Sequence, residues 1–246
     1  MFVSLITMIL AGTRALVEVD IKKIVALSTL SQLRVMIFAV GVGVPEAALF
    51  HLLTHAIFKA LLFLCVGVII HINEGRQDLR LLGGAWERAP VRVGCIEVSL
   101  VALCGVPFLS GFYSKDWVIE AGIYSGLPSV FSGLVVVGVI TRWLYSMRLV
   151  ALVARGMTKG VKGSVVGERE GGCVKVSYSL LLSGRVMLGF FLSEVFDGFL
   201  IRIESIKEEK VLVLMLGLFS LIIFIVNSLS LKAVVVVPLN RFFGSI

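Results

Sequence analysis

The feature that most restricts how this chain can fold is a predominantly apolar run from Ala47 to Ile70 that contains three ionisable side chains. As a helix, the run would extend roughly 36 Å, which exceeds the roughly 30 Å hydrocarbon core of a bilayer. His51, His55 and Lys59 recur at every fourth position, so they form one stripe along a helical face. The sequence therefore predicts a membrane-spanning helix that carries a polar stripe into the bilayer.

This stripe has two interpretations, a functional path or snorkelling side chains. Ionisable groups at the centre of a bilayer cost at least about 2.5 kcal/mol each on insertion scales, so they face protein or water and often mark proton or ion pathways. Snorkelling toward the headgroups accounts for His51, near one end of the run, but poorly for Lys59 in its middle. We therefore expect His55 and Lys59 to line a polar axis at mid-membrane.

The composition agrees with an integral membrane protein, because 58% of the 246 residues are hydrophobic, 16% are charged and the mean hydropathy is +1.03. The net charge is +7, but the basic residues lie between apolar runs and not in one patch with interleaved aromatic residues, so we expect no nucleic-acid partner. The four cysteines show no metal-ligand spacing, and we expect neither a metal site nor a disulfide framework.

Apolar runs along the chain predict an all-α integral membrane protein with about seven transmembrane helices. The runs are 2–17, which is short for a span, 24–42, 47–70, 95–122, 130–153, 176–196 and 211–231, with a loop at 71–94. When the runs are counted alternately, most loop lysines and arginines, from Lys22 and Lys23 to Arg241, fall on one side. The positive-inside tendency makes this the matrix or cytoplasmic side, with the N-terminus opposite.

The fourth run contains a predicted break near Gly105–Gly111, because Gly105, Pro107 and Gly111 interrupt it and Lys115 and Asp116 follow directly. Freed backbone groups persist at membrane depth only inside protein or beside water, so a broken helix indicates a transport site. The alternative is a kink filled by neighbouring side chains. We expect the His55 and Lys59 side chains to face this break.

Four segments resemble a known family: 20–33 (DIKKIVALSTLSQL), 54–60 (THAIFKA), 77–84 (QDLRLLGG) and 107–116 (PFLSGFYSKD). In order and spacing they resemble chain 5 of NADH:ubiquinone oxidoreductase, respiratory complex I, over about residues 4–122. A weaker similarity covers 141–148. The Lys-Asp pair at 115–116 favours chain 5 over the related antiporter-like chains.

The resemblance implies a proton-translocating subunit in which several residues have predicted roles. It implies that Lys115 exchanges protons along a hydrated central axis, while His55 and Lys59 relay them between half-channels. Three further residues are candidate members. Asp116, together with Glu120, would bias the charge of Lys115. His51 would belong to the relay, and Lys23 would be either a relay member or an orientation anchor.

The resemblance also implies the setting of the chain. We expect it in the mitochondrial inner membrane, as a multi-pass subunit of NADH:ubiquinone reductase (H+-translocating) that contacts other membrane-arm subunits of complex I and lipids, cardiolipin among them. This chain itself would carry no cofactor. NAD, FMN, iron-sulfur clusters and ubiquinone are expected elsewhere in the complex.

Several features depart from the family pattern. Arg14 and Arg34 add charge where the family has an apolar residue and a glycine. Family members are more than twice this long, so we interpret residues 1–153 as the second half of the antiporter-like core. Residues 154–246 are interpreted as peripheral transmembrane helices and the truncated start of a lateral helix. A separate chain would carry the missing N-terminal half.

Two alternative functions remain open at this point. One is a cation/proton antiporter subunit of the related bacterial type, which would place the chain in a bacterial plasma membrane. The other is a structural remnant that holds the complex together without pumping.

Overall fold

The computed structural model describes residues 1–82, 84–85, 89–105, 110–124, 128–155, 176–184, 191–192 and 195. The described part is helical, which confirms the all-α class. Its named helices are α1 (Phe2–Val17), α2 (Ile21–Val42), α3 (Pro45–Ile72), α5 (Pro90–Cys104), α6 (Ser110–Tyr124) and α7 (Ser129–Arg155). Residues 176–184 are also helical. Residues 191–192 and 195 are helical too, and the other residues of the predicted sixth span and all of the seventh lie outside the described residues.

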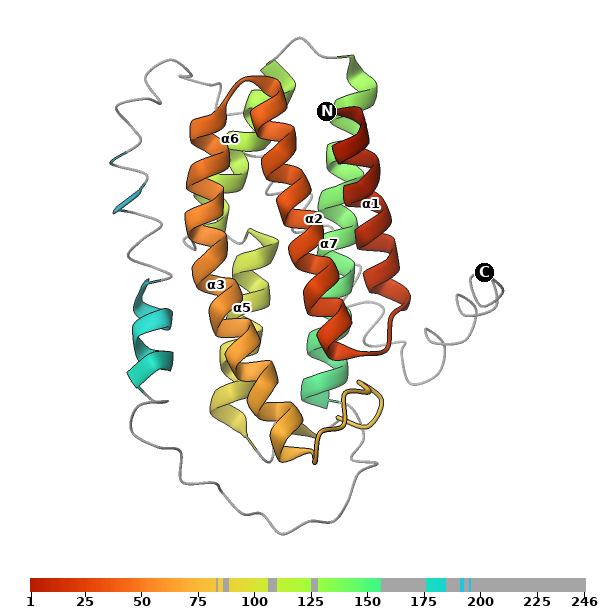
Figure 1. The fold of residues 1–246 in the computed structure, drawn as a ribbon, viewed down its shortest axis with the longest axis vertical. Coiled ribbons are helices and arrows are strands. Elements are labelled where there is room, and N and C mark those ends of the chain that lie inside the picture. The colour runs from red at the N-terminus through yellow and green to blue at the C-terminus, as the bar shows by residue number, and fades with distance from the viewer. Residues whose placement is uncertain are drawn as a thin grey trace.

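Three helices are long and apolar enough to cross a membrane: α2, α3 and the part of α7 from Gly133 to Val153. They confirm the predicted second, third and fifth spans, whereas α1 is an apolar helix of 16 residues. Figure 1 shows the helices running along the longest axis of the molecule, with α5 and α6 following one another behind α3. The chain is a multi-pass membrane protein.

The predicted break is confirmed as the junction between α5 and α6. Helix α5 ends at Cys104, Gly105 follows in the left-handed conformation with φ 86°, and α6 begins at Ser110. A left-handed glycine is a common helix terminator because it has no Cβ to clash. A Cβ on Gly111 would lie 2.0 Å from the Ala102 carbonyl oxygen, so only glycine permits this approach of α6 to α5. Pro107 lies outside the described residues.

The start of the fourth run differs from the prediction. Helix α5 begins at Pro90, not at Cys95, because proline at the first helical position has its φ already set for a helix. Arg92, which the sequence analysis placed in the loop at 71–94, is therefore buried in the first turn of α5. The loop after α3 is correspondingly shorter.

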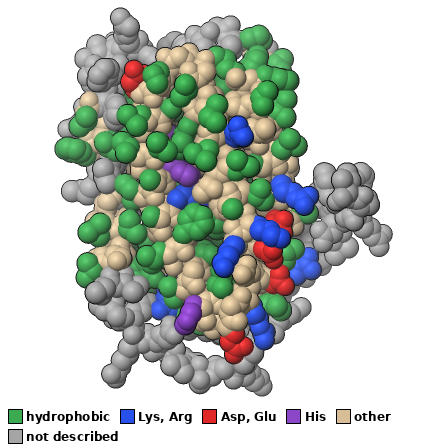
Figure 2. Space-filling view, in the orientation of Figure 1, with side chains coloured by type: hydrophobic (Ala, Val, Ile, Leu, Met, Phe, Trp, Pro, Cys, Tyr) green, Lys and Arg blue, Asp and Glu red, His purple; other side chains and the backbone are tan. Residues whose placement is uncertain are grey.

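The α1–α2 junction and the loop after α3 lie at the same end of the bundle. The Ile21 amide donates to the Gln77 carbonyl, the Leu79 amide donates to the Val19 carbonyl, and each N···O distance is 3.0 Å. Most of the charged side chains on the face shown in Figure 2 gather toward this end, while hydrophobic side chains are spread over the whole face. The shared end agrees with the alternating count of apolar runs, which placed both connections on the same side of the membrane. Which side of the membrane that is stays a prediction.

Candidate functional site: a buried polar axis

A line of polar side chains runs through the interior between α2, α3 and α6, and we call it the polar axis. None of its members is more than 6% exposed. The α3 stripe therefore faces protein, as predicted. The members are His51, His55 and Lys59 from α3, Ser28 and Gln32 from α2, and Ser114 and Lys115 from α6.

His51 joins the three helices of the axis. Its Nδ1 lies 2.9 Å from the Ser114 hydroxyl and its Nε2 lies 3.0 Å from the Gln32 Oε1. An amide oxygen can only accept, so Nε2 donates to Gln32 and Nδ1 of the neutral ring accepts from Ser114. Thr54 donates to the same Ser114 hydroxyl at 3.1 Å. The snorkelling interpretation of His51 is thus wrong, because both ring nitrogens are used inside the protein.

Lys59 is held by neutral groups of α2. Its ammonium donates to the Val25 carbonyl at 3.2 Å and to the Ser28 hydroxyl, which itself donates to the Val25 carbonyl. The hydrogen-bond partners of Lys59 that the structure shows therefore lie on α2, and the expectation that Lys59 faces the broken helix stays a prediction. No described carboxylate pairs with Lys59.

His55 lies between these two hydrogen-bonded groups. Its ring centroid is 6.0 Å from that of His51, and its ring meets Phe58 edge to face at 5.1 Å. Its Nε2 has no hydrogen-bond partner among the described residues. The packing of Phe58 therefore fixes the ring, while the nitrogen keeps its capacity to donate or accept.

Lys115 lies directly beyond the break, with its side chain against the end of α5. A Cβ on Gly105 would lie 3.4 Å from the Lys115 Cδ and 3.8 Å from its Nζ. The C-terminal end of a helix carries partial negative charge, which stabilises a cation. The side chains of Asp116 and Glu120 lie outside the described part of the chain, so their pairing with Lys115 stays a prediction.

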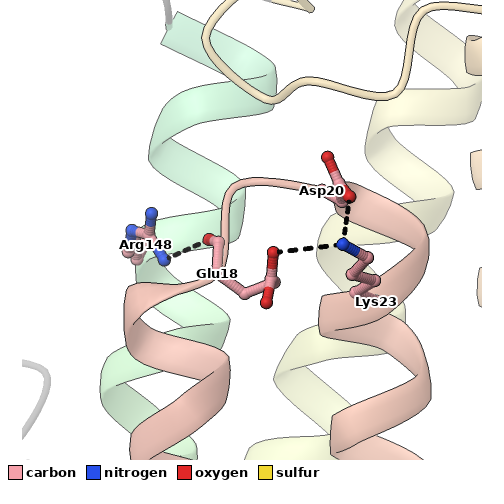
Figure 3. Close-up of polar contacts among 4 residues, drawn as sticks. All are labelled: Glu18, Asp20, Lys23 and Arg148. Atoms are coloured by element: carbon pink, nitrogen blue, oxygen red, sulfur yellow. Dashed lines mark hydrogen bonds and ion pairs between the residues drawn. The ribbon is translucent and has the colours of Figure 1, made fainter. Parts of the chain in front are cut away.

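Lys23 lies apart from the polar axis, in what we call the end cluster: Glu18, Asp20, Lys23 and Arg148. Its ammonium is 2.8 Å from the Asp20 carboxylate and 3.8 Å from that of Glu18, as Figure 3 shows. The hydrogen bond from Lys23 lowers the pKa of the Asp20 carboxyl below its ordinary value. Lys23 is thus an exposed ion-pair member, and its role as relay or anchor stays a prediction.

Arg148 closes the C-terminal end of α1 within this cluster. Its Nη1 donates to the Glu18 carbonyl at 2.9 Å (Figure 3). It also donates to the Ala15 carbonyl at 3.3 Å and to the Leu16 carbonyl. The last carbonyls of a helix have no partner within it, so a cation there satisfies them. The weak similarity at 141–148 therefore ends on a residue that ties α7 to α1.

The sequence analysis missed three members of the polar axis and one buried arginine near it. Ser28 and Gln32 share one face of α2, four positions apart, which was a readable signal. Ser114 precedes Lys115 but was not singled out. Arg142, an arginine inside the fifth span, received no role although it is only 3% exposed. Of the two residues that depart from the family pattern, Arg14 is exposed and Arg34 is half-buried.

Chemically, the axis places groups that accept and release protons within a chain of hydroxyl and amide groups. Histidine and lysine can carry a proton, and hydroxyls can rotate between donor and acceptor roles. The described residues include no cluster of His, Cys, Asp and Glu that could hold a metal ion. The arrangement is suited to moving protons.

Comparisons with known proteins agree with this chemistry. Residues 1–141 match the family model described as NADH:quinone oxidoreductase/Mrp antiporter, TM. NADH-ubiquinone oxidoreductase chain 5 of Mytilus edulis is 40% identical over 86% of this chain and 38% of the relative, and that of Aedes aegypti is 51% identical over 51% of this chain and 22% of the relative. The chain thus spans less than two fifths of the length of these relatives.

Two solved structures share the fold. A membrane-bound sulfane sulfur reductase, an archaeal respiratory membrane complex, matches 79% of this chain and 39% of its own chain with a TM-score of 0.66 and 26% identity. An Mrp complex from a Dietzia species matches 97% of this chain and 27% of its own with a TM-score of 0.73 and 23% identity, which supports the fold alone. With the family model covering more than half of its residues, the chain belongs to the transmembrane family of NADH:quinone oxidoreductases and Mrp antiporters.

Proposed function

We propose that this chain is a membrane-arm subunit of respiratory complex I and forms part of a proton-translocation channel coupled to NADH oxidation and ubiquinone reduction. The observation that carries the proposal is the polar axis: buried histidines and lysines of α3 and α6, of which His51 and Lys59 are hydrogen-bonded to neutral groups of the neighbouring helices. The named relatives are chain 5 proteins of NADH-ubiquinone oxidoreductase. This chain would carry no redox centre, and NAD, FMN, iron-sulfur clusters and ubiquinone would bind elsewhere in the complex.

The order of groups on α3 suggests the path. His51, His55 and Lys59 follow one another at a helical rise of about 6 Å per step of four residues. Lys59 would exchange a proton with His55, and His55 with His51. From His51 the proton would pass through the Ser114 hydroxyl, which accepts from Thr54 and hydrogen-bonds to His51 Nδ1. Lys115, on the same helix as Ser114, would load the next step.

The proposed setting is the mitochondrial inner membrane. There the chain would contact other membrane-arm subunits and lipids including cardiolipin. The named relatives are chains of NADH-ubiquinone oxidoreductase, which supports contact with other subunits of such a complex. Residues 1–153 would form the translocation helices and 154–246 the periphery.

The two other functions make different predictions. A cation/proton antiporter is favoured only by the fold likeness to the Mrp complex. A structural remnant would have no need of a buried, hydrogen-bonded histidine and lysine series, because burying ionisable groups opposes folding unless they are compensated.

The test compares two histidines of the same helix in membranes that contain the complex. His55→Gln removes the group at the centre of the axis, whereas His71→Gln changes an exposed histidine in the last turn of α3. We expect NADH-driven proton uptake and NADH:ubiquinone turnover to fall in His55→Gln and to persist in His71→Gln. Equal activity in both variants would establish the structural function. Purification of the chain without NADH dehydrogenase activity, with sodium-dependent proton exchange, would establish the antiporter.

A further inference from the structure

Arg142 is a buried cation in the middle of α7 that the proposed proton path does not use. It lies between Gly133 and Val153, the limits of the span, and is 3% exposed. No described residue accepts a hydrogen bond from its Nε. The described groups that interact with it electrostatically include Tyr145 and Cys104, which are both neutral at neutral pH. A guanidinium in this position needs a counter-charge, because an uncompensated buried charge is strongly unfavourable.

A small cavity lies where this charge is placed. It has a volume of about 20 Å³ and is lined by Arg142 and Lys115, with the remaining wall formed by apolar side chains of α1, α2, α6 and α7. Such a volume holds about one water-sized sphere. Two cationic side chains therefore border a compartment that is otherwise apolar.

The size and charge of this compartment select its ligand. A water molecule could accept a hydrogen bond but would leave the positive charge of Arg142 uncompensated. A monovalent anion accepts charge-assisted hydrogen bonds and neutralises one charge. Polyatomic organic anions exceed the volume. We propose that the cavity between Arg142 and Lys115 binds one small monovalent anion of the size of chloride.

This anion would act on the polar axis. Arg142 and Lys115 both lie close enough to His51 and His55 to interact with them electrostatically. Occupancy of the cavity would therefore change the charge next to the proton path, and anion supply would affect turnover. This inference goes beyond the proposed function. The structural test of anion binding does not depend on whether the proposed function is correct.

The structural test replaces chloride by bromide and locates bromide by anomalous scattering in crystals of the assembled complex. We expect a bromide peak between Arg142 and Lys115 in the wild type and in Arg14→Met, a matched change of an exposed arginine on α1. The peak should be lost in Arg142→Met. If the Arg142→Met complex does not assemble, Arg142→Lys provides the test instead. It keeps a positive charge, so it should retain the bromide peak. A wild-type cavity without bromide, or one filled by water or by the carboxylate of Asp116 or Glu120, overturns the proposal.

A second test measures NADH:ubiquinone turnover in chloride and in gluconate at equal ionic strength. Wild type and Arg14→Met should lose turnover in gluconate, and Arg142→Met should lose this anion dependence. An identical response of wild type and Arg142→Met overturns the proposed effect on the axis. Failure of the proposed function would show as equal turnover in His55→Gln and His71→Gln, or as a complex without NADH dehydrogenase activity, and either result would leave the bromide peak in place.

Discussion

The polar axis and the end cluster contain the same kinds of ionisable side chain but compensate them in opposite ways. In the end cluster, Lys23 pairs with the carboxylates of Glu18 and Asp20 and is exposed to solvent. In the axis, Lys59 is buried and its partners are a hydroxyl and a backbone carbonyl, both neutral. One lysine is compensated by charge and the other by dipoles.

This difference bears on which groups can cycle through protonation states. A lysine paired with a carboxylate leaves an unpaired negative charge when it loses its proton. A lysine held by a hydroxyl and a carbonyl leaves only neutral groups, and the hydroxyl can reorient to donate to the amine. The comparison therefore predicts proton transfer along the axis and structural fixation at the end cluster.

The largest effect is expected at Lys115. Lys115→Met keeps the approximate length but removes the charge, and Lys115→Arg keeps a charge that does not deprotonate in proteins. Both should lower proton pumping and coupled turnover, by roughly 10²-fold if a general acid-base group is lost. Assembly should be intact on native gels. A normal pumping ratio in Lys115→Arg would make Lys115 a fixed counter-charge.

Lys59 sharpens the comparison through its partner. Ser28→Ala removes the hydroxyl that accepts from Lys59 but leaves the Val25 carbonyl, so pumping should fall less than in Lys59→Met. The loss of one hydrogen bond to a charged group corresponds to about 1.5–3 kcal/mol. The measurement is proton uptake per NADH oxidised in the Ser28→Ala and Lys59→Met variants. Ser183→Ala, an exposed serine whose hydroxyl donates to a helix carbonyl, is the control.

Arg148 should affect stability more than transport. Arg148→Met leaves the last carbonyls of α1 without their donor, and we expect a loss of about 1–3 kcal/mol in the free energy of unfolding. Thermal unfolding of the purified complex should begin earlier, with an unchanged ratio of protons to NADH. A changed ratio at normal thermal stability would move the end cluster into the proton path.

The smallest effect is expected at Asp20. Because its folded-state pKa is lowered, its pairing with Lys23 adds stability above the ordinary carboxyl pKa, and this contribution is lost as pH falls through the lower folded-state value. Asp20 is half-buried but its partner Lys23 is exposed, so the contribution is small. Asp20→Asn should remove this acid dependence from thermal unfolding curves while turnover persists. A strong loss of turnover would contradict the assignment of this cluster to structure.

The sequence predicted the elements better than the partners of the side chains. Apolar runs located α2, α3 and α7, and Gly105 with Gly111 located the end of α5 and the approach of α6, because hydrophobicity and backbone geometry are local properties. The predicted start of α5 was wrong because Pro90 was interpreted as part of the preceding loop.

For the site, the sequence predicted the buried stripe of α3 but not what it contacts. The spacing of His51, His55 and Lys59 places them on one face, yet the direction of Lys59 depends on Val25 and Ser28, more than thirty positions away. Helix periodicity contains no information on how two helices are rotated against each other. The same limit applies to Arg142, whose burial depends on the packing of α1, α2 and α6 around it.

The contact between Gly105 and Lys115 has a consequence for which mutations this protein tolerates. Any side chain at position 105 would be strained by its φ of 86° and would meet the Lys115 side chain at 3.4 Å. Because the Lys115 side chain rests against this strained position, a substitution there would disturb the surroundings of the lysine without altering the lysine chemically. Functioning natural variants should therefore keep glycine at position 105. Although Gly105 has no ionisable group, it should be retained wherever Lys115 is retained.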